Sequence, residues 1–278
     1  GYISPDFSFH IVAFFSYAFF QQYDVNRFEV YGYANCPDNF ISREFAAAAT
    51  CWRNITGNSP AEAAQWIYED EIDILVDLSG HTNNNCLPVL AYKPAPVQIS
   101  GIGWFNTTGL PAVDYFLADD YTDPVGMNDG YFTEKLLRLP QSHFCYRWHD
   151  IHGECRPAPV LSNQYITFGS FNNFAKVTDE MLAAWKEILQ KVPGSKLFLK
   201  TAVFDHKEGR EDALRRMEEA GIDLKSVQLA GHTAEYLSAY ESVDIALDTY
   251  PYPGGGTTCD ALCMGVPVIT LVGQRHNS

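Results

Sequence analysis

Short apolar runs alternate with amphipathic segments along most of the chain. Residues 72–78 (IDILVDL) are apolar apart from two aspartates, which is typical of a strand buried in a parallel sheet. Similar runs predict strands at residues 28–33, 97–102, 115–118, 162–168, 196–200, 227–230, 245–247 and 268–271. Amphipathic spacing predicts helices at residues 61–69, 179–191, 208–220, 234–242 and 258–264. Strands that alternate with helices predict an α/β fold, with parallel sheets flanked by helices in both halves of the chain.

A stretch rich in Pro and Gly, residues 148–159, shows no apolar periodicity and is expected to be a linker. The length of 278 residues suits two domains of roughly 150 residues each. We place the N-terminal domain at residues 1–155 and the C-terminal domain at residues 156–278. The apolar run at residues 11–20 is shorter than the roughly 20 residues of a membrane span, so we expect a buried helix or strand.

The chain carries 19 Lys and Arg against 34 Asp and Glu side chains, a formal net charge of −15. This excess of acidic residues argues against binding to nucleic acid or to a membrane surface. Residues 1–160 contribute −11, from 8 basic and 19 acidic side chains, so the second half is the better place for an anionic ligand. The seven cysteines show no C-x-x-C pair and no zinc-ligand spacing, which predicts reduced thiols, no metal site and a cytoplasmic location.

A glycine-rich loop, YPYPGGGTTCD at residues 250–260, follows the strand predicted at 245–247. Glycines allow the backbone to approach a ligand closely, and Thr257 and Thr258 stand where the next helix should begin. The free N–H groups of a helix N-terminus suit a phosphate, and Asp260 is suited to accept hydrogen bonds from ribose hydroxyls. The alternative is a capped glycine loop without a ligand. A Walker loop is excluded because no lysine follows the last glycine.

A second polar loop, GSFNNFAK at residues 169–176, follows the strand predicted at 162–168. Lys176 is its single cation and is able to pair with a diphosphate as a mobile point charge. An isolated lysine is more often simply exposed on a loop. Two such loops in one half nevertheless favour a shared phosphate site, because ligands bind beyond the carboxyl ends of parallel strands.

Two histidines follow extended segments in the first half of the chain. His10 comes after residues 1–7, and His81 comes after the strand predicted at 72–78. Either ring is suited to act as an acid or base near neutral pH, or to bind a substrate oxygen. Taken singly, each ring is more often satisfied by a structural hydrogen bond with the backbone, and His81 is also suited to cap the strand that ends at Leu78. The histidines expected on the surface or in the linker are His143, His149, His152, His206 and His276.

Motifs in chain order resemble the catalytic region of O-linked N-acetylglucosamine (O-GlcNAc) transferases, the SPINDLY-like family linked to tetratricopeptide repeats. The matching segments are GYISPDF-x-x-H at 1–10, ILVDLSGHT at 74–82, KPAPVQ at 93–98, TTGLPA-x-DY at 107–115, FNNF-x-K at 171–176 and ALDTYPY-x-GG-x-TTCDAL-x-MGVPV at 246–268. They cover the chain from end to end, match the bacterial type of the family, and are far more specific than a single glycine loop.

The resemblance implies a GT-B glycosyltransferase, an α/β fold with two Rossmann-like lobes and a cleft between them. It implies inverting transfer of N-acetylglucosamine from UDP-GlcNAc to Ser and Thr hydroxyls of acceptor proteins, with neither a metal nor another cofactor. The N-terminal lobe would serve the acceptor side, and the C-terminal lobe would bind the UDP-sugar. No 34-residue repeat is present, so tetratricopeptide repeats are expected in the full-length chain and not in these residues.

The resemblance also assigns residues by position. His10 matches the family histidine on the acceptor side of the cleft and is the first candidate for the catalytic base. His81, singled out above by its place after a buried strand, is the second. Lys176 would hold the diphosphate, with Asn173 beside it. The residues implied to contact the rest of the nucleotide are Gly256, Thr257 and Thr258 at the phosphates, Asp260 at the ribose, and Gly231, Thr233 and Tyr236 at the uracil and ribose.

The chain departs from the animal enzymes of the family at three places. The animal enzymes have a histidine in the phosphate loop, near the position where this chain has Gly255. Their residue at the position of His81 is not a histidine, and residues 102–105 (IGWF) stand where the family has Leu-Gly-Tyr-Pro. Alternatives on the same fold are transfer from GDP-fucose, transfer of glucose from UDP-glucose to Asn, and a non-catalytic nucleotide-sugar-binding scaffold. A Rossmann dehydrogenase is disfavoured because no G-x-G-x-x-G follows the first strand.

Overall fold

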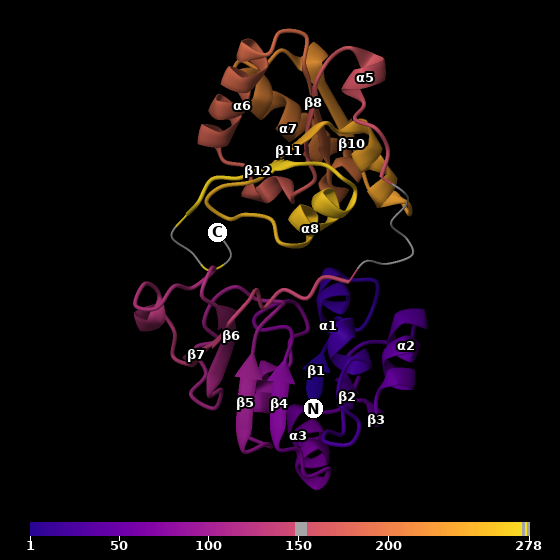
Figure 1. Ribbon diagram of the computed structural model, residues 1–278, viewed down its shortest axis with the longest axis vertical. Coiled ribbons are helices and arrows are strands. Elements are labelled where there is room, and N and C mark those ends of the chain that lie inside the picture. Colours follow the sequence, from indigo (N-terminus) through magenta and orange to yellow (C-terminus); the bar gives the residue numbers. More distant parts are fainter. Residues whose placement is uncertain (148–154, 274–275, 277–278) are drawn as a thin grey trace. The chain divides into compact units, whose positions relative to one another are not determined.

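The computed structural model describes residues 1–147, 155–273 and 276. These residues divide into two compact units, an N-terminal unit of residues 1–147 and a C-terminal unit that begins beyond it. Each unit contains a parallel sheet with helices packed against it (Figure 1). The stretch expected to be a linker falls mainly on residues 148–154, which lie outside the described residues.

In its described part, the N-terminal unit contains a seven-stranded parallel sheet in the order β3-β2-β1-β4-β5-β6-β7. The strands are β1 (Tyr2–Ser4), β2 (Tyr31–Ala34), β3 (Cys51–Asn54), β4 (Ile74–Asp77), β5 (Val97–Ser100), β6 (Tyr115–Asp119) and β7 (Lys135–Leu139). The α-helices are α1 (Ile11–Gln21), α2 (Phe40–Ala48), α3 (Pro60–Glu69) and α4 (Leu87–Leu90). The strand order reverses between β1 and β4, where Ile3 pairs with Asp77. In Rossmann-type sheets, ligands bind at the carboxyl ends of the two strands that flank such a reversal.

The C-terminal unit repeats this plan among its described residues, with a five-stranded parallel sheet in the order β10-β9-β8-β11-β12. The strands are β8 (Thr167–Ser170), β9 (Lys196–Lys200), β10 (Val227–Ala230), β11 (Ile245–Leu247) and β12 (Val268–Ile269). The α-helices are α5 (Val160–Asn163), α6 (Asp179–Lys191), α7 (Lys207–Glu219) and α8 (Gly256–Cys263). Here the order reverses between β8 and β11, so the loops that follow these two strands are brought together.

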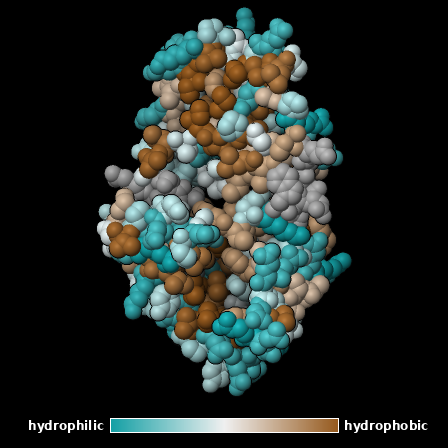
Figure 2. Space-filling model, viewed as in Figure 1, coloured by the Kyte–Doolittle hydropathy of each residue, from teal (hydrophilic) through white to brown (hydrophobic). Residues whose placement is uncertain are grey.

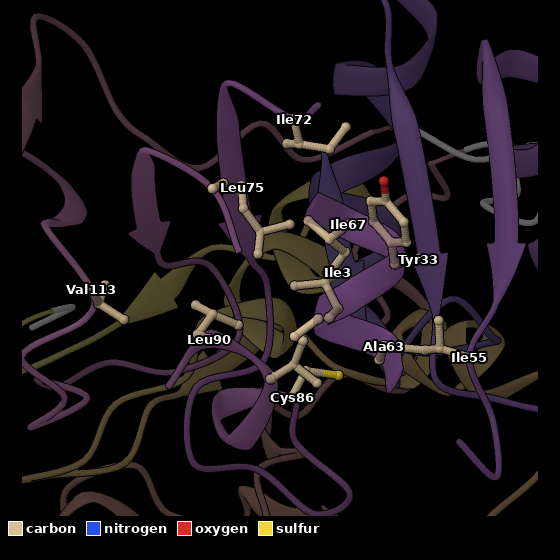
Figure 3. Close-up of a cluster of buried hydrophobic side chains, with 13 residues drawn as sticks. Ile3, Tyr33, Ile55, Ala63, Ile67, Ile72, Leu75, Cys86, Leu90 and Val113 are labelled. Atoms are coloured by element: carbon tan, nitrogen blue, oxygen red, sulfur yellow. The ribbon is translucent and has the colours of Figure 1, made fainter. Parts of the chain in front are cut away.

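Buried apolar side chains pack the helices against the sheets. Figure 3 shows Ile3, Tyr33, Ile67 and Leu75 gathered in one cluster, from β1, β2, α3 and β4, and all four are fully buried. Burial of a side chain of this size contributes about 1.5–3 kcal/mol, so the cluster fixes α3 against the sheet. In the C-terminal unit, a second cluster that includes Leu182, Leu197, Phe204 and Met217 fixes α6 and α7 in the same way.

Local signals in the sequence set the helix ends. α3 begins with a capping box, in which Ser59 Oγ accepts from Glu62 N and the Glu62 carboxylate accepts from Ser59 N. α6 begins after Thr178, whose hydroxyl accepts a hydrogen bond from Met181 N. α7 ends just before Gly221, which has a φ of 80°, a left-handed conformation that favours glycine.

The predicted bounds of α6, β9, β10 and β11 are confirmed. The apolar run at 11–20 is helical, and most of its residues are buried because α1 is apolar on nearly every side. The strand predicted at residues 162–168 is wrong before residue 167, because residues 160–163 form α5 and β8 begins only at Thr167. The helix predicted at 234–242 is a 3₁₀ helix, Tyr236–Ser242.

The apolar patterns did not predict α2, β3 or β7. The two strands are the edges of the N-terminal sheet, and none of their residues is fully buried. Edge strands need fewer apolar residues than central ones, so they resemble loops in the sequence.

Hydrophobic and hydrophilic residues are interspersed on the face of the molecule shown in Figure 2. Large apolar side chains are exposed in both units, among them Val25, Tyr121, Leu161 and Val272, and such scattered exposure is ordinary for globular proteins. Within residues 1–147, 155–273 and 276, no helix combines the length and the apolar character needed to cross a bilayer.

Candidate functional site

The loop after β11 leads into a helix N-terminus without a side-chain cap. α8 begins at Gly256, and Gly255 before it supplies no side-chain hydrogen bond to the first turn. The N–H groups of the first turn of a helix have no acceptor within the helix. They carry partial positive charge, so this end of α8 is suited to a phosphate group.

Asp248 organises this loop from the end of β11. Its Oδ1 accepts hydrogen bonds from Gly254 N at 2.7 Å and from Thr249 N at 2.8 Å. The same oxygen accepts from Asn172 Nδ2 at 3.2 Å, and Asn172 Oδ1 in turn accepts from the Thr257 hydroxyl at 3.1 Å. These hydrogen bonds join the loop after β8 to the loop after β11, as expected for the two loops that flank the reversal in strand order.

Gly254 leaves no room for a side chain. A Cβ atom at this position would lie 2.4 Å from Thr257 Oγ1, 3.0 Å from Asn172 Oδ1 and 3.1 Å from Asp248 Oδ1. Three polar atoms that hold the loop together therefore converge on the space that glycine keeps empty.

We expect Gly254→Ala to weaken UDP binding by about tenfold or more. Overpacking costs about 1–3 kcal/mol, and relief of the clash moves the Thr257 hydroxyl at the start of α8. Gly130→Ala is the matched control, because a Cβ there has no heavy atom of the described residues within 4 Å. Calorimetric titration with UDP checks both variants. Equal affinity of the Gly254→Ala variant and the unaltered chain would show that the loop does not contact the nucleotide.

Lys176 approaches the same loop from the 3₁₀ helix Phe174–Lys176. Its ammonium donates to Pro253 O at 3.1 Å and lies 4.2 Å from the centre of the Tyr252 ring. Burial lowers the pKa of Lys176, and the Asp248 carboxylate opposes that shift. No carboxylate among the described residues forms an ion pair with Lys176. A half-buried cation without a counterion is suited to an anionic ligand.

Two predicted residues beside Lys176 and Gly256 have local hydrogen bonds of their own. The exposed Asn173 caps the 3₁₀ helix, since its Oδ1 accepts from Ala175 N at 3.0 Å. The Thr258 hydroxyl donates to Gly254 O at 3.2 Å. Their predicted contacts with phosphate therefore require these side chains to exchange or share a hydrogen bond.

A hollow of about 190 Å³ opens beside α8, at the carboxyl ends of β9 and β10. Its lining includes Phe171, Lys200, Thr201, Ala202, Gly231, His232, Tyr236, Tyr240 and Thr257. Three of the predicted nucleotide residues thus line one hollow. A Cβ atom at Gly231 would lie 1.8 Å from Asp205 Oδ1, so a side chain there would displace the carboxylate that accepts a hydrogen bond from His232 N.

Lys200 anchors the loop that carries two predicted residues. Its buried ammonium donates to Gly231 O at 2.5 Å and to the Thr233 hydroxyl at 2.9 Å. Burial lowers the pKa of Lys200, and the charge of Asp205 opposes the shift. The Thr233 hydroxyl is therefore already bound within the protein.

Asp260 lies in α8 with a side chain that is almost fully buried. Its Oδ2 accepts a hydrogen bond from the Tyr236 hydroxyl at 3.2 Å. Burial and the neighbouring Asp260 carboxylate raise the pKa of Tyr236. The two residues predicted to contact the ribose form a pair, and a ribose hydroxyl would have to share or replace the bond between them.

His10 is the N-cap of α1 in the N-terminal unit. Its Nδ1 accepts a hydrogen bond from Val12 N at 3.3 Å and lies 3.6 Å from Asp6 Oδ1. The ring is 44% exposed, so a substrate has access to it. When Nδ1 accepts from a backbone N–H, a neutral ring carries its proton on Nε2.

His81 is exposed, and its Nε2 lies 2.7 Å from Thr108 O. Its ring packs edge-on against Trp104, with centroids 5.6 Å apart. It does not cap the preceding strand, which was one expectation for this residue. The buried Asp77 does so instead, because its carboxylate accepts from Ser79 N, Gly80 N and the hydroxyls of Ser79 and Ser100.

The expectation that His143 is a surface residue is wrong. The side chain is fully buried, and Nδ1 lies 2.6 Å from Asp119 Oδ2. Burial alone would raise the pKa of Asp119, but hydrogen bonds from Thr122 and His143 hold it well below its usual range. His276 is also buried, His206 is exposed as expected, and His149 and His152 lie outside the described residues.

The structure thus brings the predicted nucleotide residues together in the C-terminal unit, while His10 and His81 belong to the N-terminal unit. Sequence reasoning assigned no role to Asn172, Lys200 or Asp248. A signal for each was present, because each stands at or just after the end of a buried strand. The described residues contain no cluster of three or more His, Cys, Asp or Glu that could hold a metal ion.

Comparison with known proteins identifies the family and the fold of the chain. A family model described as glycosyl transferase family 41 matches residues 1–152 and 149–278. The chain is 40% identical, over 286 residues, to the probable UDP-N-acetylglucosamine–peptide N-acetylglucosaminyltransferase SPINDLY of Solanum lycopersicum. That match covers 99% of this chain and 30% of the relative, so the chain spans about 30% of that relative's length.

Solved structures show the same fold. A mutant of the Thermobaculum terrenum O-GlcNAc transferase is 33% identical, with a TM-score of 0.92 over 99% of this chain and 53% of that chain. Anabaena HepE in complex with UDP and glucose is 12% identical, with a TM-score of 0.59 over 96% of this chain and 78% of its own. The predicted GT-B glycosyltransferase fold is confirmed by these likenesses. The chain belongs to glycosyl transferase family 41.

Proposed function

We propose that the chain is the catalytic region of an inverting, metal-independent transferase that moves N-acetylglucosamine from UDP-GlcNAc to Ser and Thr hydroxyls of proteins. The observation that carries this proposal is the meeting of two loops in the C-terminal unit. The Lys176 ammonium contacts Pro253 O, three residues before the N-terminus of α8. The names of the relatives, a peptide N-acetylglucosaminyltransferase and an O-GlcNAc transferase, support the choice of sugar and acceptor.

The chemistry requires a stabilised leaving group. The acceptor oxygen bonds to the anomeric carbon while the bond from that carbon to the β-phosphate oxygen breaks. The electron pair of the broken bond leaves with UDP, so negative charge develops on the β-phosphate. Lys176 and the N-terminus of α8 supply fixed positive charge for that phosphate, which is the task a metal ion performs in other transferases.

The acceptor hydroxyl loses its proton during the transfer, so the reaction requires a base. His10 is the best placed candidate, because its ring is accessible and a carboxyl lies 3.6 Å from it. His81 is the weaker candidate, because its Nε2 is within hydrogen-bond distance of a carbonyl oxygen.

A donor panel tests the proposal. We expect UDP-GlcNAc at 100 times its dissociation constant to stabilise the chain by about 2.7 kcal/mol in thermal unfolding, with EDTA making no difference. UDP-glucose and GDP-fucose, the donors of the alternative reactions, should give smaller shifts at equal concentration. A larger thermal shift with GDP-fucose would indicate that GDP-fucose, and not UDP-GlcNAc, is the donor. Binding of UDP-GlcNAc without transfer by the full-length protein would favour a nucleotide-sugar-binding scaffold.

We further propose a cytoplasmic protein without nucleic-acid or membrane partners. The net charge of −15 and seven cysteines, all of them outside disulfides, support this proposal. Tetratricopeptide repeats in the full-length chain remain a prediction from the family resemblance.

A further inference from the structure

The reversal in strand order of the N-terminal sheet gathers two carboxyl groups and one imidazole. Asp77 ends β4, and Asp6 and His10 follow the neighbouring strand β1. The charges of His10 and Asp77 act on the Asp6 carboxyl. The charge of Asp6 acts in turn on the thiols of Cys36 and Cys86. Among the described residues, no Lys or Arg forms an ion pair with either carboxyl group.

The two carboxyl groups differ in the hydrogen bonds they accept. Asp77 is saturated, because its two oxygens accept four hydrogen bonds from Ser79, Gly80 and Ser100. The carboxyl of Asp6 accepts none from the described residues, and its Oδ2 is buried. A buried carboxylate oxygen without a donor is destabilised, so Asp6 is the group with capacity for a further N–H.

The N-cap geometry creates a conflict for the proposed base. With Nδ1 accepting from Val12 N, a neutral His10 ring holds its proton on Nε2, the nitrogen that faces away from the helix backbone. A nitrogen that already carries a proton cannot accept another one. To act as a base through Nε2, the ring has to carry its proton on Nδ1, and that proton needs an acceptor other than Val12 N.

We infer that Asp6 is a positioning residue that holds the proton of His10 on Nδ1 and thereby frees Nε2 to act as the base. This inference rests on the proposed transfer reaction. The 3.6 Å between Nδ1 and Asp6 Oδ1 has to shorten by less than 1 Å to reach the usual length of a charged hydrogen bond. The bond from Val12 N to Nδ1 is then lost, and a bond from Nδ1–H to the Asp6 carboxylate replaces it.

The proton balance of the step follows from this exchange. As the acceptor oxygen attacks the anomeric carbon, its proton passes to Nε2 of His10. The ring becomes an imidazolium, and the ionised Asp6 stabilises it through Nδ1–H. The proton leaves Nε2 for solvent after UDP and product depart, which restores the neutral ring. Burial and the nearby charge of Asp77 raise the pKa of Asp6, while His10 opposes them, so the carboxylate gains stability from a protonated ring.

The first test reads the position of the ring proton directly. Nitrogen-15 spectra of the histidine rings in the 278-residue chain distinguish Nδ1–H from Nε2–H. Above neutral pH we expect a substantial fraction of Nδ1–H at His10 in the unaltered chain, and Nε2–H alone in Asp6→Asn. His206, exposed at the start of α7 with no side-chain cap bond, is the internal control whose signals should stay unchanged. A His10 ring that carries Nε2–H alone in the unaltered chain would overturn the inference, without need of any variant.

The second test uses turnover by the full-length enzyme. We expect Asp6→Asn to lower kcat by about 10²-fold, to leave KM for the donor unchanged and to alter the pH profile of kcat. Asp24→Asn is the matched control, because this carboxylate lies in an exposed turn and accepts from Asn26 N. An unchanged kcat in Asp6→Asn would refute the role of Asp6 and leave the proposed function intact. An Nδ1–H observed at His10, together with no transfer from any donor, would refute the proposed function but not the pairing of Asp6 with His10.

Discussion

Replacement of Lys176 by Ala is expected to weaken UDP binding by about 10- to 100-fold and to lower turnover by a further 10²–10³-fold. The first effect follows from the loss of a charged hydrogen bond to phosphate, worth about 1.5–3 kcal/mol. The second follows because the charge on the β-phosphate grows in the transition state, so a fixed cation stabilises that state more than the bound substrate. Calorimetric titration with UDP and turnover of UDP-GlcNAc measure the two effects separately.

Lys176→Arg should restore little of this loss. The ammonium fits between Pro253 O and the face of the Tyr252 ring, a place shaped for a compact charge and not for a planar guanidinium. Lys191→Ala is the control, since among the described residues this exposed lysine of α6 pairs only with Glu187 four residues earlier. The alanine variant at position 176 should remain folded, because burial disfavours the charged lysine in the free protein. Unchanged UDP affinity in Lys176→Ala would refute the phosphate assignment.

Replacement of His10 by Asn is expected to lower turnover by about 10²–10⁴-fold while UDP affinity stays within a few-fold. The loss is that of general base catalysis. Nucleotide affinity should hold because the residues proposed to bind UDP all belong to the C-terminal unit. Asparagine is a preferred N-cap, so it should continue to accept from Val12 N and preserve the start of α1.

His10→Ala separates the structural role from the chemical one. It removes the cap as well as the ring, so it should cost about 0.5–2 kcal/mol of stability that His10→Asn does not. Both variants should show the same loss of turnover. His81→Ala should cost less turnover, because its ring nitrogen is already close to Thr108 O. A His10→Asn enzyme with the normal rate and pH profile would show that another group takes the proton.

The carboxyl ends of the buried strands could be predicted from the sequence, and with them most of the C-terminal site. Continuous apolar runs mark β9 and β11, and the glycines of residues 254–256 mark the turn into α8, so the loop that we propose to bind phosphate could be located before any coordinates. The same reasoning missed Asp248 and Asn172, because their hydrogen bonds join the two loops to each other. Such hydrogen bonds depend on strand order, which apolar periodicity does not contain.

His143 and His10 show the same limit of what a sequence pattern can predict. His143 looked like a loop residue because its partner, Asp119, is 24 positions away at the end of β6. His10 follows an extended run in the sequence, and in the structure it follows β1, which is one of the two strands at the reversal in strand order. The direction of its Nδ1, toward Val12 N and Asp6, depends on helix capping and on side-chain rotamers that a sequence pattern leaves open.

A crystal structure of the chain with UDP tests the proposed phosphate site most directly. We expect the β-phosphate within hydrogen-bond distance of Lys176 Nζ and of N–H groups in the first turn of α8, with the uracil in the hollow lined by Gly231 and Tyr236. UDP bound at any other place in the chain, or no UDP at saturating concentration, would contradict the assignment of the C-terminal loops to the nucleotide.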